Sequence, residues 1–376
     1  MGNVTIMIIG LGEVGGKALE ILARKPGISR IVTADINEEY GQQKTNNAVF
    51  GAQYEGFFPN IDFVKVNLHN SEETAAILKR IEPFIIFNST SLQSYWVVEL
   101  LPKEVHKKFQ SAGYGPWLPM HLTFCYNLMR AVKEAGIRTY VINGAYPDAV
   151  NPVLSKVGLA PIVGIGNIEL VVPQLRKVVS LKLNVPIRSI SIFLVMHHYA
   201  EYWVVREGHT GGAPYFLKVL VDGDDVSKKF SGEQLFSDII NYARRPGRPD
   251  GHYMVASSAI QKIMSIYNDT QELSHAPGPA GLIGGYPIRL GAQGVEVILP
   301  REITNEEAVK INEDSQKMEG IEAIKEDGTV RFTDKSCKIM KELLGYDCKE
   351  MKINDCAERA HELGSLYKRF TKRYIK

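Results

Sequence analysis

Three glycines near the N-terminus, Gly10, Gly12 and Gly15, have the spacing of a dinucleotide-binding turn. The apolar run Val4–Ile9 precedes them and a helical pattern follows, so the turn would join a buried strand to a helix. Gly10 would allow the tight turn, Gly12 would let a pyrophosphate approach the backbone, and Gly15 would let the helix pack on the sheet. The unpaired N–H groups of the helix N-terminus, around Glu13 and Val14, would then bind the phosphates.

An acidic residue, Asp35, stands 20 positions after Gly15, directly after the apolar run Arg30–Ala34. A carboxylate at this distance typically accepts hydrogen bonds from the adenosine ribose. It would also repel a 2′-phosphate, so the sequence favours NAD over NADP. NADP stays open as the less favoured cofactor, because Arg30 and Lys44 are cations that could rearrange toward a phosphate.

A second polar turn, Asn88-Ser89-Thr90, ends the apolar run Phe84–Asn88. In a doubly wound sheet the ligand crevice lies outside the carboxyl ends of the strands. We therefore expect Asn88, Ser89 and Thr90 to contact a ribose or a nicotinamide, and a plain helix-capping run is the alternative interpretation.

The elements that must position these turns alternate between strand and helix over the first 150 residues. Such alternation predicts a parallel sheet with right-handed crossovers, and hence a Rossmann domain over residues 1–150. The expected strands are Val4–Ile9, Arg30–Ala34, Ile61–Val66, Phe84–Asn88 and Thr139–Ile142, and the expected helices are Lys17–Arg24, Ser71–Ile81 with Ser71 as N-cap, and Met120–Ala135.

The remaining chain predicts an α/β substrate domain over residues 151–320 and a helical extension over residues 321–376. In the second domain we expect helices from Ala149 to Leu183, interrupted at Val163–Gly166, strands Ser189–Met196 and Tyr215–Val221, helix Met254–Tyr267, and a hairpin of Gly285–Leu290 and Val295–Leu299. Thr304 and Glu307 have the spacing of a capping box and predict the start of a further helix. The extension reads as one strand and two helices.

Composition excludes several classes of protein. The 376 residues carry a formal net charge of +2, so no overall field points to nucleic acid. We find no apolar run long enough to span a membrane and no signal-peptide pattern, which predicts a cytoplasmic protein. The four cysteines form no CxxC pair, so we expect reduced thiols and no metal site.

Several later segments resemble motifs of the lactate/malate dehydrogenase superfamily. Asn143–Val150 resembles its Asn-Pro-x-Asp segment, with two extra residues after the asparagine, and Gly164–Glu169 is similar to its Gly-x-x-Asn-Leu-Asp run. The strand Ile190–Met196 leads into two histidines where that family has its catalytic histidine, and Gly285–Glu296 resembles its late hairpin. The resemblance covers roughly residues 4–320.

The resemblance implies hydride transfer to or from NAD, with a histidine as general acid/base and a carboxylate that raises the pKa of this histidine. By position, His198 would be the acid/base, in preference to His197, and Glu169 its partner. Asn143 would orient the nicotinamide or the substrate. The alternative interpretations are that neither histidine is catalytic and that Glu169 is an ordinary acidic residue in the first turn of a helix. The family also implies a homodimer or homotetramer.

Departures from the family pattern concern the substrate. The position of the arginine that binds the substrate carboxylate is Val172, and Leu92–Gly115 contains no arginine. Additional segments follow His198, and another spans Arg244–His252. We therefore expect a larger, polar or anionic substrate. Its candidate contacts are Arg176, His197, Arg248 and His252.

The leading hypothesis is an NAD-dependent oxidoreductase that acts on a secondary alcohol or carbonyl other than a simple 2-hydroxy acid. An amine/imine dehydrogenase of saccharopine or opine type is the first alternative, because the carboxylate-binding arginine is missing. A non-catalytic NAD-binding sensor is the second.

Overall fold

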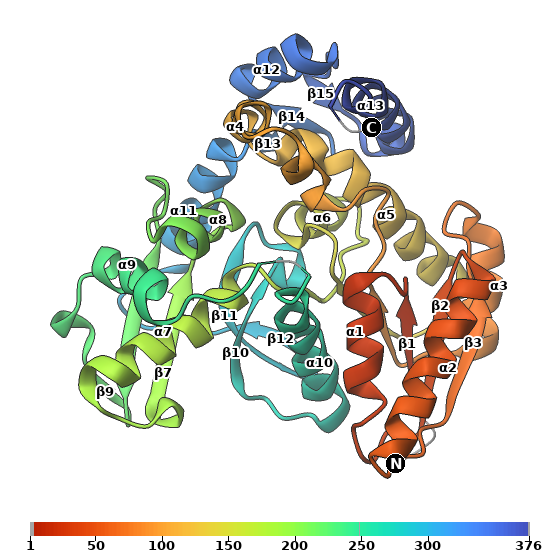
Figure 1. Cartoon of the computed structure of the whole chain (residues 1–376), viewed down its shortest axis with the longest axis horizontal. Helices are drawn as coiled ribbons and strands as arrows, with labels where there is room; N and C mark the ends of the chain where they lie inside the picture. The colour runs from red at the N-terminus through yellow and green to blue at the C-terminus, as the bar shows by residue number, and fades with distance from the viewer. Residues whose placement is uncertain (1–3, 248, 375–376) are drawn as a thin grey trace.

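The computed structural model describes residues 4–247 and 249–374, and its N-terminal half is built on a six-stranded parallel sheet (Figure 1). The strand order is β3-β2-β1-β4-β5-β6, which is the doubly wound Rossmann order. The strands are β1 (Thr5–Ile9), β2 (Arg30–Asp35), β3 (Ile61–Lys65), β4 (Ile85–Asn88), β5 (Tyr140–Asn143) and β6 (Val163–Gly164). The predicted parallel α/β fold is thereby confirmed.

Both faces of the sheet are covered by helices, which is why β1 is buried at every position. Ile6 and Ile8 pack in one core with α1 and α10, whereas Met7 and Ile9 pack in another core with α3 and α5. The helices of this half are α1 (Glu13–Leu22), α2 (Glu38–Tyr54), α3 (Ser71–Ile81), α4 (Lys103–Ala112), α5 (Leu118–Ala135) and α6 (Pro147–Ser155).

Two small antiparallel sheets and four helices form the middle of the chain, with α11 after them (Figure 1). The strands are β7 (Ile190–Val195), β8 (Phe216–Val221) and β9 (Asp224–Asp225) in one sheet, and β10 (Leu273–Pro277), β11 (Gly285–Gly291) and β12 (Gly294–Val297) in the other. The helices are α7 (Ile168–Leu183), α8 (His198–Glu207), α9 (Gly232–Tyr242), α10 (His252–Asn268) and α11 (Asn305–Met318). The predicted β11–β12 hairpin and the Thr304–Glu307 capping box are both present.

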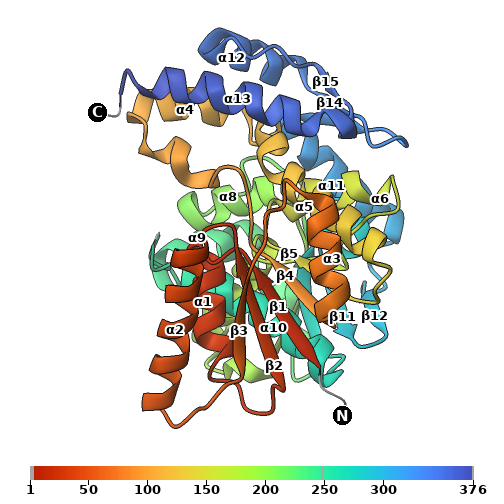
Figure 2. The same ribbon diagram turned by 90° about the vertical axis from the view of Figure 1, so that its right-hand side faces the viewer.

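The C-terminal extension lies across α4 and α5 (Figure 2). It contains β13 (Ile321–Ile324), β14 (Val330–Phe332), β15 (Glu350–Met351), α12 (Asp334–Leu344) and α13 (Cys356–Thr371). Its apolar side chains belong to the same core as those of α5, and Phe109 of α4 packs edge-on against Tyr367 and Phe370. The extension therefore has three short strands where one was predicted, and it completes the hydrophobic core that it shares with α5.

Two local predictions need correction. Asn70 caps α3 instead of Ser71, because its side chain accepts the N–H of Glu73, and Ser71 is the first helical residue. The additional segment after His198, for which no secondary structure was predicted, is largely helix α8. Within the described ranges, none of the helices combines the length and apolar character that a membrane span needs.

Candidate active site

A cavity of about 860 Å³ opens at the carboxyl ends of the parallel strands. One wall comes from the β1–α1 turn and the ends of β2 and β4, and the other from the start of α7, α8 and the segment before α10. This is the place where doubly wound sheets bind their ligands.

The glycine turn at one end of this cavity has the form that a dinucleotide needs. The backbone of Gly10 has φ +91°, which favours glycine, and a Cβ on Gly15 would lie 1.9 Å from the carbonyl oxygen of Gly10. A Cβ on Gly12, by contrast, would meet no atom within 4 Å. Gly12 is also the N-cap of α1 and has no side chain to satisfy the first N–H groups. The open space above these donors fits a pyrophosphate.

Asp35 lies at the cavity wall after β2 and is held by backbone donors. One carboxylate oxygen accepts the N–H of Leu11 at 2.8 Å, and the other accepts the N–H of Asn37 at 2.9 Å. These bonds fix the carboxylate beside the glycine turn, where an adenosine ribose would lie.

The polar turn after β4 contains one buried residue, which supports the turn, and two residues that line the cavity. Asn88 is fully buried and its Oδ1 accepts the N–H and the hydroxyl of Thr90, the latter at 2.6 Å. Ser89 and Thr90 line the cavity, whereas Asn88 does not. Of the other predicted cofactor residues, Gly10, Gly12, Glu13, Val14 and Asp35 line the cavity, and Gly15 serves packing.

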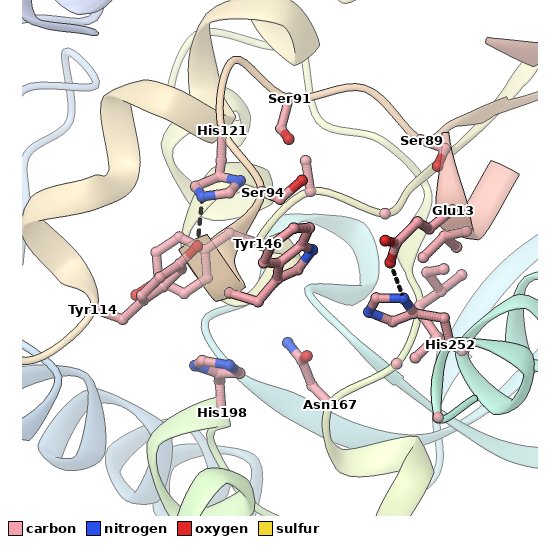
Figure 3. A pocket seen from close by; sticks show the side chains of 18 of the residues that line it. Glu13, Ser89, Ser91, Ser94, Tyr114, His121, Tyr146, Asn167, His198 and His252 are labelled. Carbon is pink, nitrogen blue, oxygen red and sulfur yellow. Dashed lines mark hydrogen bonds and ion pairs between the residues drawn. The ribbon is translucent and has the colours of Figure 1, made fainter. Parts of the chain in front are cut away.

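His252, expected to contact the substrate, lines the cavity and lies against the glycine turn. Its Nδ1 pairs with the carboxylate of Glu13 in the first turn of α1 (Figure 3). The packing of α10 on α1 explains this placement, because His252 is the first residue of α10.

At the other end of the cavity, His198 and Glu319 form an ion pair. His198 begins α8, and its Nδ1 contacts Glu319 Oε1. Glu319 Oε2 accepts the hydroxyl of Tyr146 at 2.7 Å, and the His198 backbone N–H donates to Asp148 Oδ1 at 3.1 Å. Because Nδ1 is engaged, Nε2 is the nitrogen of His198 that can exchange a proton with a substrate.

The charges around His198 make it a stronger base than an ordinary histidine. Burial lowers its pKa, but the negative charge and the hydrogen bond of Glu319 outweigh burial and raise the pKa to about 9. Burial raises the pKa of Glu319, yet the facing His198 charge outweighs it, and the net direction is down. The pair is therefore an imidazolium and a carboxylate at neutral pH.

Aromatic side chains frame this pair. The Tyr114 hydroxyl and His121 Nε2 are 2.6 Å apart, and the rings of Tyr114 and Tyr146 lie 5.7 and 5.6 Å from the imidazole of His198 (Figure 3). Burial lowers the pKa of His121 to about 3, with a further contribution from the His198 charge, so His121 stays neutral. Of the two histidines beside Tyr114, only His198 is therefore charged at neutral pH.

Two non-glycine residues beside the pair have left-handed backbone torsions. Tyr146 has φ +44° and Asn167 has φ +52°, and both line the cavity. The Asn167 amide donates to Asp148, the residue that also accepts the N–H of His198. Such strain persists only where the surroundings enforce it, and it concentrates at functional sites.

Glu319 reaches the site because the turn between α4 and α5 holds its backbone. The N–H of Gly115 donates to the Glu319 carbonyl at 2.8 Å, and a Cβ on Gly113 would lie 2.2 Å from the same oxygen. Glu319 caps the C-terminal end of α11, where the helix dipole disfavours an acid. That unfavourable position, directly before Gly320, is the one sequence signal that could have found it.

Glu169 does not contact His198, which corrects the expected pairing. Its carboxylate lies 2.9 Å from the fully buried ammonium of Lys262 on α10. Asn167, the N-cap of α7, lines the cavity, whereas Glu169 in the first turn of the helix faces α10.

Three further predicted contacts lie away from the cavity wall. Asn143 is fully buried, where it bonds to the Asn151 amide and to both backbone groups of Ala145, and so supports the turn before Tyr146. Arg176 lies two helical turns after Glu169 and shares its direction. His197 is buried as the N-cap of α8, accepting the N–H of Tyr199. Arg248 lies outside the described residues.

The chain is similar to solved structures, although comparisons of its sequence find no match. Neither a family model nor a curated sequence matches the chain. The malate dehydrogenase of Picrophilus torridus is similar with a TM-score of 0.58 at 17% identity, over 84% of this chain and 96% of that one. The lactate dehydrogenase of Cryptosporidium parvum, solved with lactic acid and NAD, gives 0.57 at 17% identity, over 85% and 98%. A lactate dehydrogenase from a deep-sea metagenome gives 0.55 at 13% identity, over 85% and 97%. The chain therefore has the fold of the lactate and malate dehydrogenases, as its motifs predicted.

Proposed function

We propose that this protein is an NAD-dependent dehydrogenase that interconverts a secondary alcohol and a carbonyl. The observation that carries the proposal is one cavity with a dinucleotide turn at one end and the His198–Glu319 ion pair at the other. A sensor that only bound NAD would have no use for a buried acid/base pair of this kind, so the pair favours an enzyme.

Each half of the cavity has a distinct task. The N–H groups at Gly12 would bind the pyrophosphate, and Asp35 the ribose hydroxyls. NAD, when bound, supplies the hydride acceptor or donor. Nε2 of His198 would donate a proton to a substrate carbonyl oxygen or accept one from a hydroxyl, while Glu319 fixes the tautomer and stabilises the imidazolium. Apolar Val172 cannot bind a substrate carboxylate, so simple 2-hydroxy acids held in the family's manner are disfavoured.

The cofactor assignment is tested by fluorescence titration with NADH and NADPH. We expect the wild type to prefer NADH, and Asp35→Ala to lower the ratio of the two affinities by about tenfold, or ~1.4 kcal/mol, since ribose hydrogen bonds are lost and a 2′-phosphate is no longer repelled. Asp347→Ala, which removes an exposed acid paired with Lys341 in the C-terminal extension, is the control. Wild-type protein that binds neither dinucleotide would refute the proposed function.

The pH dependence of turnover tests the acid/base assignment. Carbonyl reduction needs protonated His198, whose pKa is raised to about 9. We expect kcat/KM for reduction to be level through neutral pH and to fall about tenfold per pH unit above about 9. Alcohol oxidation needs the neutral imidazole of His198, so kcat/KM for oxidation should rise about tenfold per pH unit up to about pH 9. A midpoint near about 6.5, the value of an ordinary histidine, would contradict the role of Glu319.

A further inference from the structure

Helix α8 carries a second carboxylate along the cavity wall. Glu201 lies one helical turn after His198, and both line the cavity. Only 5% of Glu201 is exposed, although its side chain carries a charge. A buried carboxylate is costly unless charged partners compensate it, so the partners of Glu201 decide what the site can bind.

The compensation of Glu201 is incomplete. Its one ion pair among the described residues joins Oε1 to a terminal guanidinium nitrogen of Arg245 at 3.5 Å, the limit of a hydrogen bond. Arg245 Nε is also buried, without a hydrogen-bond partner in the described part of the chain. Burial raises the pKa of Glu201, and Arg245, His198 and Arg206 oppose that rise.

The neighbouring ion pair on the same wall shows the contrast. Arg206, two turns after His198 on α8, lies 3.0 Å from Glu99 and stacks 3.9 Å above the Tyr202 ring. Arg206 is thus committed to protein partners. On the described part of this wall, Glu201 and Arg245 are therefore the charged pair that has hydrogen-bonding capacity left for a ligand, whereas Arg244, which also lines the cavity, is exposed to solvent.

On the basis of the proposed function, we propose that the substrate is an α-amino acid. Its carboxylate would bind the guanidinium of Arg245, and its ammonium group would bind Glu201. A zwitterion satisfies both members of the pair, whereas an anion alone would face the Glu201 charge and a cation alone would face Arg245. In this proposal Arg245 takes the role of the family's carboxylate-binding arginine, whose position in this chain is occupied by Val172.

The spacing on α8 also limits where the reaction occurs. Side chains one turn apart have Cβ atoms about 5–6 Å apart. The hydroxyl that exchanges its proton with His198 must therefore lie close to the zwitterionic group. This points to β-hydroxy-α-amino acids. The cavity beside the aromatic side chains of Tyr202 and Trp203 would accommodate a bulky substituent.

A substrate panel with wild-type protein tests the proposal without any variant. The panel, with NAD⁺ and formation of NADH as the readout, contains all four stereoisomers of threonine and of 3-phenylserine. Two analogues accompany it: 3-hydroxybutyrate, which lacks the amine, and 1-amino-2-propanol, which lacks the carboxylate. Binding of each compound to the NAD⁺ complex is measured in parallel by calorimetry. We expect at least one hydroxy amino acid to react, with kcat/KM at least about thirtyfold above both analogues.

Variants then assign the recognition to the pair. Glu201→Gln should raise KM for that amino acid by about thirtyfold or more, with kcat changed only a few-fold. Glu207→Gln, which removes an exposed carboxylate at the end of the same helix, should leave KM unchanged. If the analogues react equally well, if Glu201→Gln keeps its KM, or if no amino acid reacts or binds while NADH does, the proposal is wrong and the dehydrogenase assignment stands. Failure to bind NADH would remove the assignment itself.

Discussion

Replacing His198 by alanine is expected to lower kcat by about 10²–10⁴-fold, the usual contribution of a positioned general acid/base. The affinity for NADH should stay within a few-fold of the wild-type value, because the glycine turn and Asp35 lie at the other end of the cavity. Stopped-flow absorbance of the nicotinamide gives the rate of the chemical step, and fluorescence titration gives the affinity. Full activity in His198→Ala would show that the proton is exchanged elsewhere.

Glu319→Gln separates the charge of the partner from the presence of the histidine. Without that charge, burial lowers the pKa of His198, and only the smaller contributions of Asp148 and Glu201 oppose it. The midpoint for carbonyl reduction should therefore move down by two or more pH units, to about 6.5 or lower. At about pH 8 the variant should reduce the carbonyl at least tenfold more slowly than the wild type.

Glu169→Gln is the matched control, because Glu169 is the acid that the family motif selects. It should leave the pH midpoint in place. Removing the Glu169 charge would leave the buried ammonium of Lys262 without its carboxylate partner and lower the free energy of unfolding by about 3 kcal/mol. An unchanged midpoint in Glu319→Gln, together with a shifted one in Glu169→Gln, would restore the assignment made from the sequence.

The sequence predicted the fold well because its strongest signals are local. The apolar β-branched strands, the glycine turn and the Thr304–Glu307 capping box each depend on residues within a few positions of one another. Their order along the chain then allows few topologies. The similarity to solved dehydrogenase structures confirms the predicted fold.

The candidate site was harder to predict because its central pair joins residues 121 positions apart. The family motif led to Glu169, whereas the acid beside His198 is supplied by the end of α11 and held by the turn at Gly113–Gly115. Only tertiary packing decides which of two buried acids meets the histidine. The same holds for His252, whose contact with Glu13 depends on the packing of α10 against α1.

Helix α8 illustrates a different limit. The motif placed a histidine at the end of a strand but said nothing of the next ten residues. Because they form a helix, Glu201 and Tyr202 come back to the cavity one turn after His198. The proposed substrate recognition thus depends on the helical periodicity of α8, which the family resemblance did not predict.

Gly12→Val is expected to abolish most cofactor binding while leaving the fold intact. A side chain there would enter open space and meet no protein atom within 4 Å, so the packing of α1 is preserved. The same side chain would occupy the space in front of the α1 N-terminus. Charge-assisted hydrogen bonds are worth about 1.5–3 kcal/mol each, so losing one or two should raise the Kd for NADH by about a hundredfold.

Gly15→Ala is the informative contrast, since both glycines belong to one turn. Its Cβ would lie 1.9 Å from the Gly10 carbonyl oxygen, which cannot give way without moving α1 from the sheet. We expect a loss of about 1–3 kcal/mol in unfolding free energy from this overpacking. For Gly12→Val we expect at most about 1 kcal/mol, from the weaker N-cap. Thermal unfolding and NADH titration of both variants separate the two effects. If Gly12→Val binds NADH as tightly as the wild type, the phosphates do not lie at this turn, and the cofactor would have to occupy the cavity in another orientation.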